Sequence, residues 1–227
     1  MSEISALDAL ATTRSIHRYR PDPIPDEDLS KILWSATRAP SGTNRQPFRF
    51  LVLRDGERSR QAKALLGSSF RKSWSVKAAD EGWRDGADPD PNSRRFRTAE
   101  TMQRFVDRFE EIPVVVLVCM ARYRSSNPYE GASVYPACQN LLLAARALGY
   151  GSTITVWHGF CEAELRALLG IPDSVLIAAT MPLGRPEGSH GPLRRLPVGE
   201  LVYDDAWEAS ASWVRDPPES RFSRPRS

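Results

Sequence analysis

The sequence predicts an α+β fold, with one central sheet flanked by helices, and three observations support this class. Short β-branched, apolar stretches that indicate buried strands alternate with longer stretches of helical periodicity. The length of 227 residues suffices for one large domain with a sizeable core. No internal repeat or low-complexity tract divides the chain. We therefore expect a single domain over residues 1–227.

The first quarter of the chain predicts two helices and a strand. Apolar residues at helical spacing in 4–11 indicate the first helix, and the prolines of 21–25 form an extended connector. Acidic residues at 26–28 suit a helix N-terminus, where the dipole favours negative charge. The apolar stripe of that helix runs through 29–36, and residues 48–53 have the pattern of a strand.

The segment 67–111 has a different character. Glycine, proline and aspartate mark a loop at 82–93, and apolar residues at helical spacing follow from Met102 to Phe109. We expect a partly helical insertion or lid at about 67–111 that governs substrate choice.

The second half of the chain continues the alternation. The pattern predicts in turn a strand, a helix, a strand, a helix and a strand, at 113–119, 135–148, 152–156, 162–169 and 175–181. Gly149 caps the longer of these helices. The tail after Val202 has no clear periodicity, although Trp207 and Trp213 indicate that it docks on another surface.

The charge balance and hydropathy exclude several functional classes. Lysine and arginine total 31 against 28 acidic residues, a net charge of +3 that does not favour nucleic-acid binding. No run approaches the roughly 20 apolar residues that a membrane helix needs. The N-terminus lacks the apolar core of a secretory signal. We expect a soluble, cytoplasmic protein without a membrane partner.

The cysteines do not indicate a metal centre or a disulfide scaffold. There are three, Cys119, Cys138 and Cys161, and none forms a C-x-x-C pair. We expect each to be a small buried apolar residue, and we expect no bound metal.

Four stretches carry the residues that suggest chemistry. They are RSIHRY (14–19); APSGTNRQPF (39–48); ALGYGS (147–152) followed by WHG (157–159) and LRALLGIP (165–172); and PLGRP (182–186) with RRLP (194–197) and Trp207. In this order, and over nearly the whole chain except 67–111, they resemble the nitroreductase family.

This resemblance implies a fold and an activity. The fold would be a central mixed sheet flanked by helices, in a homodimer with flavin sites at the subunit interface. The cofactor would be flavin mononucleotide (FMN). The reaction would transfer hydride from NAD(P)H through flavin N5 to a nitroaromatic or quinone-like acceptor, by a two-electron ping-pong mechanism.

The resemblance also implies a phosphate site. Guanidinium groups match phosphate oxygens bidentately, and this role falls to Arg14 and Arg195, with Arg194 as the neighbouring alternative. Ser15 can donate its hydroxyl to the same phosphate. His17 stands where the family usually has arginine or lysine, and a neutral histidine offers one donor and no charge.

A second part of the implied site approaches the flavin ring. The small residues of Pro40, Ser41 and Gly42 permit close approach of backbone to the ring, and in the family this stretch serves the partner's flavin. Asn44 either pairs with the polar edge of the ring or closes the loop as a turn residue. Gln46 is assigned to the cofactor site with the same alternative, that it only ties the loop down.

The third part is Trp157, His158 and Gly159, where the family places backbone donors near flavin N5. His158 is a candidate general acid, with a structural histidine as the alternative. No general acid is strictly required, because solvent can protonate the product.

Several alternatives stay open at this point. Relatives with a similar P-S-G stretch catalyse reductive dehalogenation or oxygen-dependent flavin breakdown. A flavin- or ligand-binding protein without turnover is favoured by Thr13 and His17, which stand where the family has basic residues. A deazaflavin could replace FMN. No G-x-G-x-x-G fingerprint is present to indicate how a nicotinamide cofactor is bound, so NADH and NADPH are not distinguished.

Overall fold

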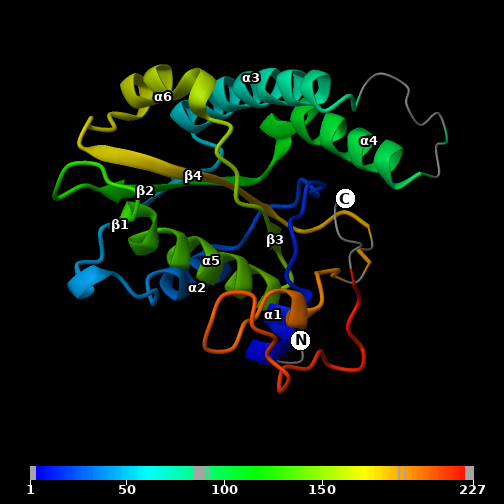
Figure 1. Cartoon of the computed structure of the whole chain (residues 1–227). Helices are drawn as coiled ribbons and strands as arrows, with labels where there is room; N and C mark the ends of the chain where they lie inside the picture. The colour runs from blue at the N-terminus through cyan, green and yellow to red at the C-terminus, as the bar shows by residue number, and fades with distance from the viewer. Residues whose placement is uncertain (1–3, 84–89, 91–92, 189, 192, 223–227) are drawn as a thin grey trace.

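The structure, a computed structural model, describes residues 4–83, 90, 93–188, 190–191 and 193–222. It has three layers (Figure 1), with α3, α4 and α6 covering one face of a central sheet and α2 and α5 covering the other. The predicted α+β class with a central sheet flanked by helices is confirmed.

The elements have the following bounds. The helices are α1 (Ala6–Thr12), α2 (Asp26–Ala36), α3 (Glu57–Asp80), α4 (Arg94–Asp107), α5 (Tyr135–Ala147) and α6 (Glu162–Leu169). The strands are β1 (Phe48–Leu53), β2 (Val114–Ala121), β3 (Gly151–Ser152) and β4 (Val175–Gly184). Short 3₁₀ turns are η1 (Gly42–Asn44), η2 (Phe109–Glu111), η3 (Glu130–Ser133), η4 (Gly159–Cys161) and η5 (Val198–Glu200).

The sheet has the strand order β1-β2-β4-β3, and neighbouring strands pair antiparallel. Leu53, the last residue of β1, lies opposite Val115 at the start of β2. Helices α3 and α4 connect β1 to β2 and run in opposite directions. The chain therefore enters β2 at the same end of the sheet at which it leaves β1. This return makes β1 and β2 antiparallel. The other ladders among the described strands are antiparallel as well, whereas the family resemblance implied a mixed sheet.

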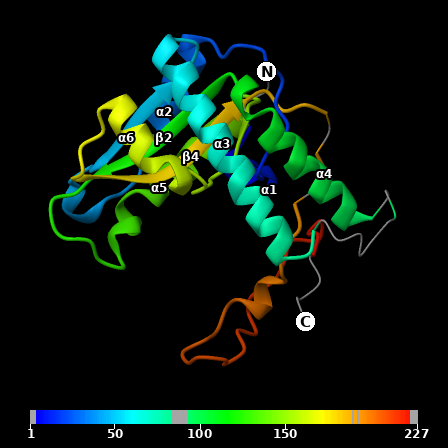
Figure 2. The same cartoon turned by 90° about the horizontal axis from the view of Figure 1, so that it is seen from above.

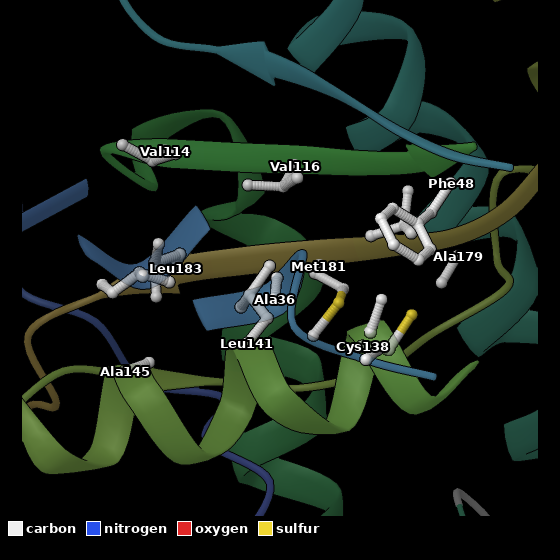
Figure 3. Packing of buried hydrophobic residues seen from close by; sticks show 14 of the residues in the cluster. Ala36, Phe48, Val114, Val116, Cys138, Leu141, Ala145, Ala179, Met181 and Leu183 are labelled. Atoms are coloured by element: carbon white, nitrogen blue, oxygen red, sulfur yellow. The ribbon is translucent and has the colours of Figure 1, made fainter. Parts of the chain in front are cut away.

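Strand β2 is buried on both faces and joins the two cores. Its even-numbered residues from Val114 to Met120 face α2 and α5, and its odd-numbered residues Val115, Leu117 and Cys119 face α3 and α6. Successive side chains of a strand point to opposite faces, so an unbroken apolar run is expected where both faces are covered. Figure 3 shows the first of these cores, with Cys138, Leu141 and Ala145 of α5 packed under β2 and β4.

The segment 67–111 comprises the C-terminal part of α3, together with α4 and η2. Helix α3 runs without interruption through Gly67, where an added Cβ would lie 2.2 Å from Oε1 of Glu110. This glycine permits close packing against η2 and does not mark a boundary. Phe105 and Phe109 are buried in the core on this face of the sheet. Residues 84–89 and 91–92 of the predicted 82–93 loop lie outside the described residues.

The strand predicted at 152–156 is shorter than expected. Only Gly151 and Ser152 pair with β4, and the chain touches that strand again at an isolated bridge between Thr155 and Thr180. Between these points the chain leaves the sheet edge, so Ile154 and Val156 are 38% and 57% exposed. The β-branched composition of the segment therefore reflects an exposed apolar strip and not a full strand.

Trp207 and Trp213, which predict that the C-terminal tail docks on another surface, are exposed on this chain. These side chains are 81% and 67% exposed. Figure 2 shows the tail, orange to red, extending away from the layered body. Leu7 of α1 and Trp34 of α2 are also exposed, at 78% and 62%. Large apolar side chains of the tail, of α1 and of α2 are thus exposed on this chain.

The cysteine prediction is confirmed. Cys119, Cys138 and Cys161 are free and buried, and burial raises the pKa of Cys119 to about 11 and of Cys138 to about 12. In the described part of the chain, no three His, Cys, Asp or Glu side chains gather in a way that could hold a metal ion. No described helix is both long and apolar enough to cross a bilayer.

Candidate functional site

A cavity of about 760 Å³ gathers the charged residues that the sequence analysis assigned to phosphate binding. We call it the arginine cavity, because six arginines line it: Arg14, Arg18, Arg94, Arg97, Arg194 and Arg195. Ser15 and His17 line the same cavity. Five candidate residues from two distant segments of the sequence, 14–17 and 194–195, are therefore brought together.

The segment that carries Arg14 is fixed to the edge of the sheet. Ile16 donates its backbone N–H to the carbonyl of Ser152 at 3.1 Å, and Tyr19 forms a bridge with Pro186. An added Cβ on Gly151 would lie 2.5 Å from Cγ1 of Ile16, so only glycine allows the two backbones to lie this close. With Ile16 buried, its neighbours Ser15 and His17 both lie at the arginine cavity.

The arginine cavity offers hydrogen-bond donors that have no partner among the residues that the structure describes. Among the described residues, none of its six arginines takes part in a salt bridge. Arg14 donates from Nη1 to the carbonyl of Gly191 at 2.5 Å, while its Nε is buried with no described partner. A buried donor without an acceptor is costly, and an anion in the cavity would satisfy it.

Two histidines at the cavity carry no charge at neutral pH. Burial, with smaller contributions from Arg14 and His190, lowers the pKa of His17 to about 4. Burial also lowers the pKa of His190, and Arg18 and Arg14 add to that effect. His17 packs edge-on against Phe105, with ring centroids 5.1 Å apart. Each neutral ring supplies at most one N–H donor to a ligand.

The loop around Pro40, Ser41 and Gly42 is held by its own hydrogen bonds. Oγ of Ser41 accepts from the backbone N–H of Gln46 at 2.9 Å, and Nε2 of Gln46 donates to Oδ1 of Asn44 at 3.2 Å. Asn44 and Gln46 have φ values of 53° and 51°, in the left-handed region. Both side chains therefore take part in a hydrogen bond within the loop, and their assignment to the flavin site stays a prediction.

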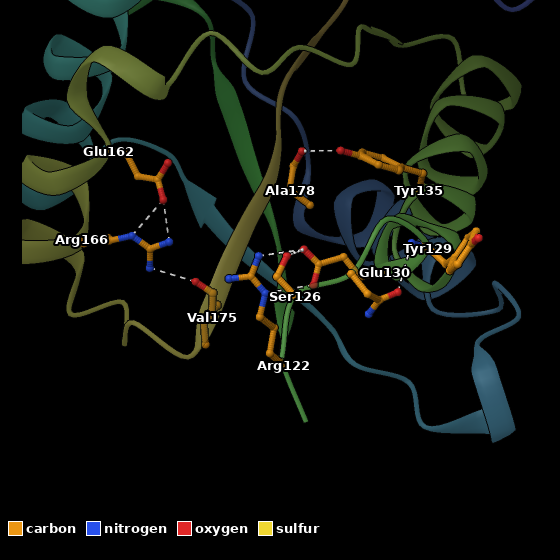
Figure 4. A network of polar contacts seen from close by, with 10 residues as sticks. Arg122, Ser126, Tyr129, Glu130, Tyr135, Glu162, Arg166, Val175 and Ala178 are labelled. Atoms are coloured by element: carbon orange, nitrogen blue, oxygen red, sulfur yellow. Dashed lines mark hydrogen bonds and ion pairs between the residues drawn. The ribbon is translucent and has the colours of Figure 1, made fainter. Parts of the chain in front are cut away.

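This loop rests on a second segment of the chain. Gly42 donates its backbone N–H to Oγ of Ser133 at 3.2 Å, at the end of η3. The start of η3 is anchored by an ion pair of 2.7 Å between Arg122 and Glu130, which Figure 4 shows together with Ser126. The backbone of Gly42 is thereby held in a defined position.

The loop and the arginine cavity lie at opposite ends of the molecule. In Figure 1, η1 is the light-blue turn at the lower left, whereas α4, which lines the arginine cavity, lies at the right. A single chain therefore does not bring Pro40, Ser41 and Gly42 to the arginines.

Trp157, His158 and Gly159 lie at the entrance to η4. His158 is only 5% exposed, and its Nδ1 lies 3.2 Å from Oγ1 of Thr180. Burial lowers the pKa of His158. The carbonyl of Trp157 accepts a hydrogen bond of 2.5 Å from Oγ of Ser69 on α3. These contacts fix the turn, so the imidazole has a structural position behind the surface, while Gly159 is exposed.

Sequence reasoning missed several residues of the arginine cavity. The sequence analysis assigned no role to Arg94, Arg97 or His190, which line this cavity as well. Arg94, Arg97 and Thr101 share one face of α4, at helical spacing, and all three line the cavity. Arg95, by contrast, donates to the carbonyls of Glu81 and Gly82. The pattern of arginine and threonine at i, i+3 and i+7 was the available signal.

Comparison with known proteins gives a consistent result. The model of the nitroreductase family matches residues 10–185. A NADH dehydrogenase of Thermus thermophilus is 30% identical over 212 residues, covering 88% of this chain and 95% of that protein. An iodotyrosine deiodinase of Thermotoga neapolitana is 28% identical over 190 residues, covering 83% and 91%.

A solved structure shows a similar fold. It is an oxidised iodotyrosine deiodinase bound to FMN and 3-iodo-L-tyrosine, with a TM-score of 0.62 and 25% identity. The match covers 84% of this chain and 95% of that one.

Proposed function

This chain belongs to the nitroreductase family, and from that premise we propose that it is an FMN-dependent oxidoreductase. It would oxidise NAD(P)H and reduce a nitroaromatic or quinone-like acceptor. The observation that carries the proposal is the arginine cavity, whose six guanidinium groups have no described carboxylate partner. A phosphate monoester supplies the charge and the acceptors that such a cavity lacks.

The residues present fit the FMN phosphate. Arg14, with its buried and unpartnered Nε, and Arg195 would hold the phosphate oxygens, and Ser15 would donate its hydroxyl. His17 would add one neutral donor. Bound FMN would supply a two-electron redox centre between the nicotinamide and the acceptor.

The turn at 157–159 would present backbone to the flavin ring. Gly159 is exposed, which makes its backbone N–H a candidate donor to the ring. His158 would act as a positioning residue, because its contact with Thr180 holds this turn against β4. The exposed side chains of Ile154, Val156 and Phe160 would pack on apolar surface and exclude water from the site.

We further propose that the functional unit is a homodimer. The P-S-G loop and the arginine cavity lie at opposite ends of one chain, so a complete site would need the loop of a partner. The exposed apolar side chains Leu7, Leu10, Trp207 and Trp213 would become buried in such an assembly. Obligate interfaces of this kind bury on the order of 2,000 Å² or more.

The dimer can be tested by solution mass. We expect light scattering to give twice the chain mass of 25.4 kDa. Leu7→Glu combined with Leu10→Glu should weaken the dimer and release flavin. Both changes place a charge on an apolar surface that the dimer would bury. The matched control is Val76→Glu, an apolar-to-acidic change at an exposed site on α3. A monomeric mass with full flavin occupancy would contradict the proposal.

The activity predicts a kinetic pattern. We expect the purified protein to be yellow, and the flavin absorbance to bleach anaerobically with NADH or NADPH. One cavity over the ring would serve both substrates in turn, so initial-rate plots should be parallel when both are varied. Intersecting lines would rule out this order of binding. A colourless protein that gains no flavin on reconstitution would overturn the proposed function itself.

Reductive dehalogenation is the second candidate, because deiodinases are among the relatives that this chain resembles. Release of iodide from 3-iodo-L-tyrosine by the reduced protein would support it. Turnover of nitroaromatics without iodide release would support the first candidate.

Arg194 and Arg195 should differ in their effect on the cofactor. We expect Arg195→Ala to weaken FMN binding by about ten- to a hundredfold, since a hydrogen bond to a charged group contributes roughly 1.5–3 kcal/mol. Arg194→Ala should have a smaller effect, measured by fluorescence titration of the stripped protein. Equal or reversed effects would show that Arg194 holds the phosphate.

A further inference from the structure

The arginine cavity contains more positive charge than one cofactor phosphate needs. Six arginines line it, while a phosphate monoester carries about −1.5 to −2 at neutral pH. If Arg14 and Arg195 hold that phosphate as proposed above, Arg18, Arg94, Arg97 and Arg194 are left without a counterion. Crowded like charges destabilise the compact state, so a second anion would stabilise this arrangement.

No salt bridge between described residues neutralises this surplus. Glu187, in the adjoining cavity, pairs with Arg104 at 2.8 Å and lies 3.9 Å from Arg108. Among the described lining residues of the arginine cavity there is no carboxylate. The cavity itself therefore keeps its net positive charge.

Part of the surplus lies on one helix face. Arg94 and Arg97 occupy successive turns of α4 and both line the arginine cavity, and Thr98 and Thr101 follow them on the same helix and line it too. Arg94 has no described side-chain partner, and Arg97 donates only to the carbonyl of Ser93 at 3.3 Å. Two guanidinium forks beside a hydroxyl are suited to a dianion with several oxygens.

The cavity is also larger than a single phosphate requires. Its volume of about 760 Å³ falls within the roughly 300–1,000 Å³ typical of pockets that hold a whole small molecule. The residues of α4 that line the cavity and Arg14 can therefore contact different phosphate groups at the same time.

We infer that Arg94 and Arg97 bind the 2′-phosphate of NADPH, so that this enzyme uses NADPH in preference to NADH. The inference rests on the proposed function, because it assigns the electron donor of that same site. A 2′-phosphate is a dianionic monoester and matches the paired forks. A carboxylate, with one charge, would leave most of the surplus uncompensated.

The first test is binding of redox-inactive probes to the FMN-loaded protein by calorimetry. We expect adenosine 2′,5′-bisphosphate to bind at least tenfold more tightly than adenosine 5′-monophosphate. The variant Arg94→Ala/Arg97→Ala should lose this difference, with flavin content unchanged. Arg95→Ala is the matched control, because Arg95 points to Glu81 and Gly82 and should leave the preference intact.

The second test is stopped-flow bleaching of the flavin. The NADPH concentration that half-saturates flavin reduction in the wild type should be at least about tenfold lower than the NADH concentration. In the double variant these two concentrations should be equal. Equal use of both donors by the wild type would overturn the inference and leave the proposed function standing. Loss of FMN from the double variant would also overturn it, since these arginines would then hold the cofactor. Bleaching by neither donor would refute the proposed function and this inference with it.

Discussion

Replacing Arg14 with alanine is expected to lower the affinity for FMN by about a hundredfold or more, the largest effect of any single change in the cavity. Arg14 is the arginine whose Nε is buried without a described partner. Its desolvation cost on binding an anion is therefore the smallest of the six. A charged hydrogen bond of this kind contributes roughly 3 kcal/mol, which corresponds to about two orders of magnitude in Kd.

Titration of the stripped protein with FMN would measure this effect, with Arg14→Lys as the matched control. Lysine keeps the charge but lacks the fork, so its loss should be intermediate, about tenfold. The flavin-free alanine variant should melt no earlier than the flavin-free wild type, because it removes an unsatisfied buried donor. An affinity within twofold of the wild type would show that the phosphate is not held at Arg14.

Replacing Phe70 with alanine is expected to destabilise the whole chain by about 3–5 kcal/mol, the typical cost of removing a buried aromatic ring. Phe70 of α3 is fully buried and contacts the rings of Phe105, Phe109 and Trp157, with centroids 4.3–5.8 Å apart. Its loss would open a cavity where α3, η2 and the end of α4 meet.

Urea unfolding would measure the change, and the melting temperature should fall by roughly 6–20 °C. Val76→Ala is the matched control, because Val76 lies on the same helix and is 47% exposed; its cost should be under about 0.5 kcal/mol. If Phe70→Ala were equally mild, α3 and α4 would behave as a detachable lid. A single cooperative transition at a lower urea concentration would show that they belong to the core.

Elements with a clear period and clear ends could be predicted from the sequence. Strand β1 and helix α6 have the predicted bounds, and α2 begins at the predicted acidic turn. Gly170, which ends α6, has a φ of 67°, as expected for a left-handed cap. In these segments local preference and tertiary packing favour the same structure.

The local sequence pattern was a poor guide where a residue's conformation depends on a contact with a distant part of the chain. Gly67 suggested a boundary, but its purpose is contact with Glu110, more than 40 positions away in the chain. Residues 152–156 are β-branched, yet only Ser152 of them pairs as a strand, because the apolar side chains that follow are exposed. After Val202 the described tail forms no helix or strand, and of its apolar residues Ala211 is buried while Trp207 and Trp213 are exposed.

Some residues of the candidate site could likewise be predicted from the sequence, and others could not. Arg14, Ser15, His17, Arg194 and Arg195 could be grouped by motif, and they do share a cavity. The contribution of α4 could not be predicted, because arginines on one helix face look like solvated charge until the opposite wall is known. His158 was a plausible acid by residue type, but its burial behind Thr180 depends on the fold.

The position of β4 between β2 and β3 has a consequence for synthesis on the ribosome. Strand β2 ends at Ala121, but the strand that covers its second edge ends only at Gly184. At about 5–20 residues per second, the intervening segment of about 60 residues takes roughly 3–12 s to make. During that time the most apolar strand of the sheet has an open edge, so the nascent chain is a natural client for a chaperone that binds extended apolar segments.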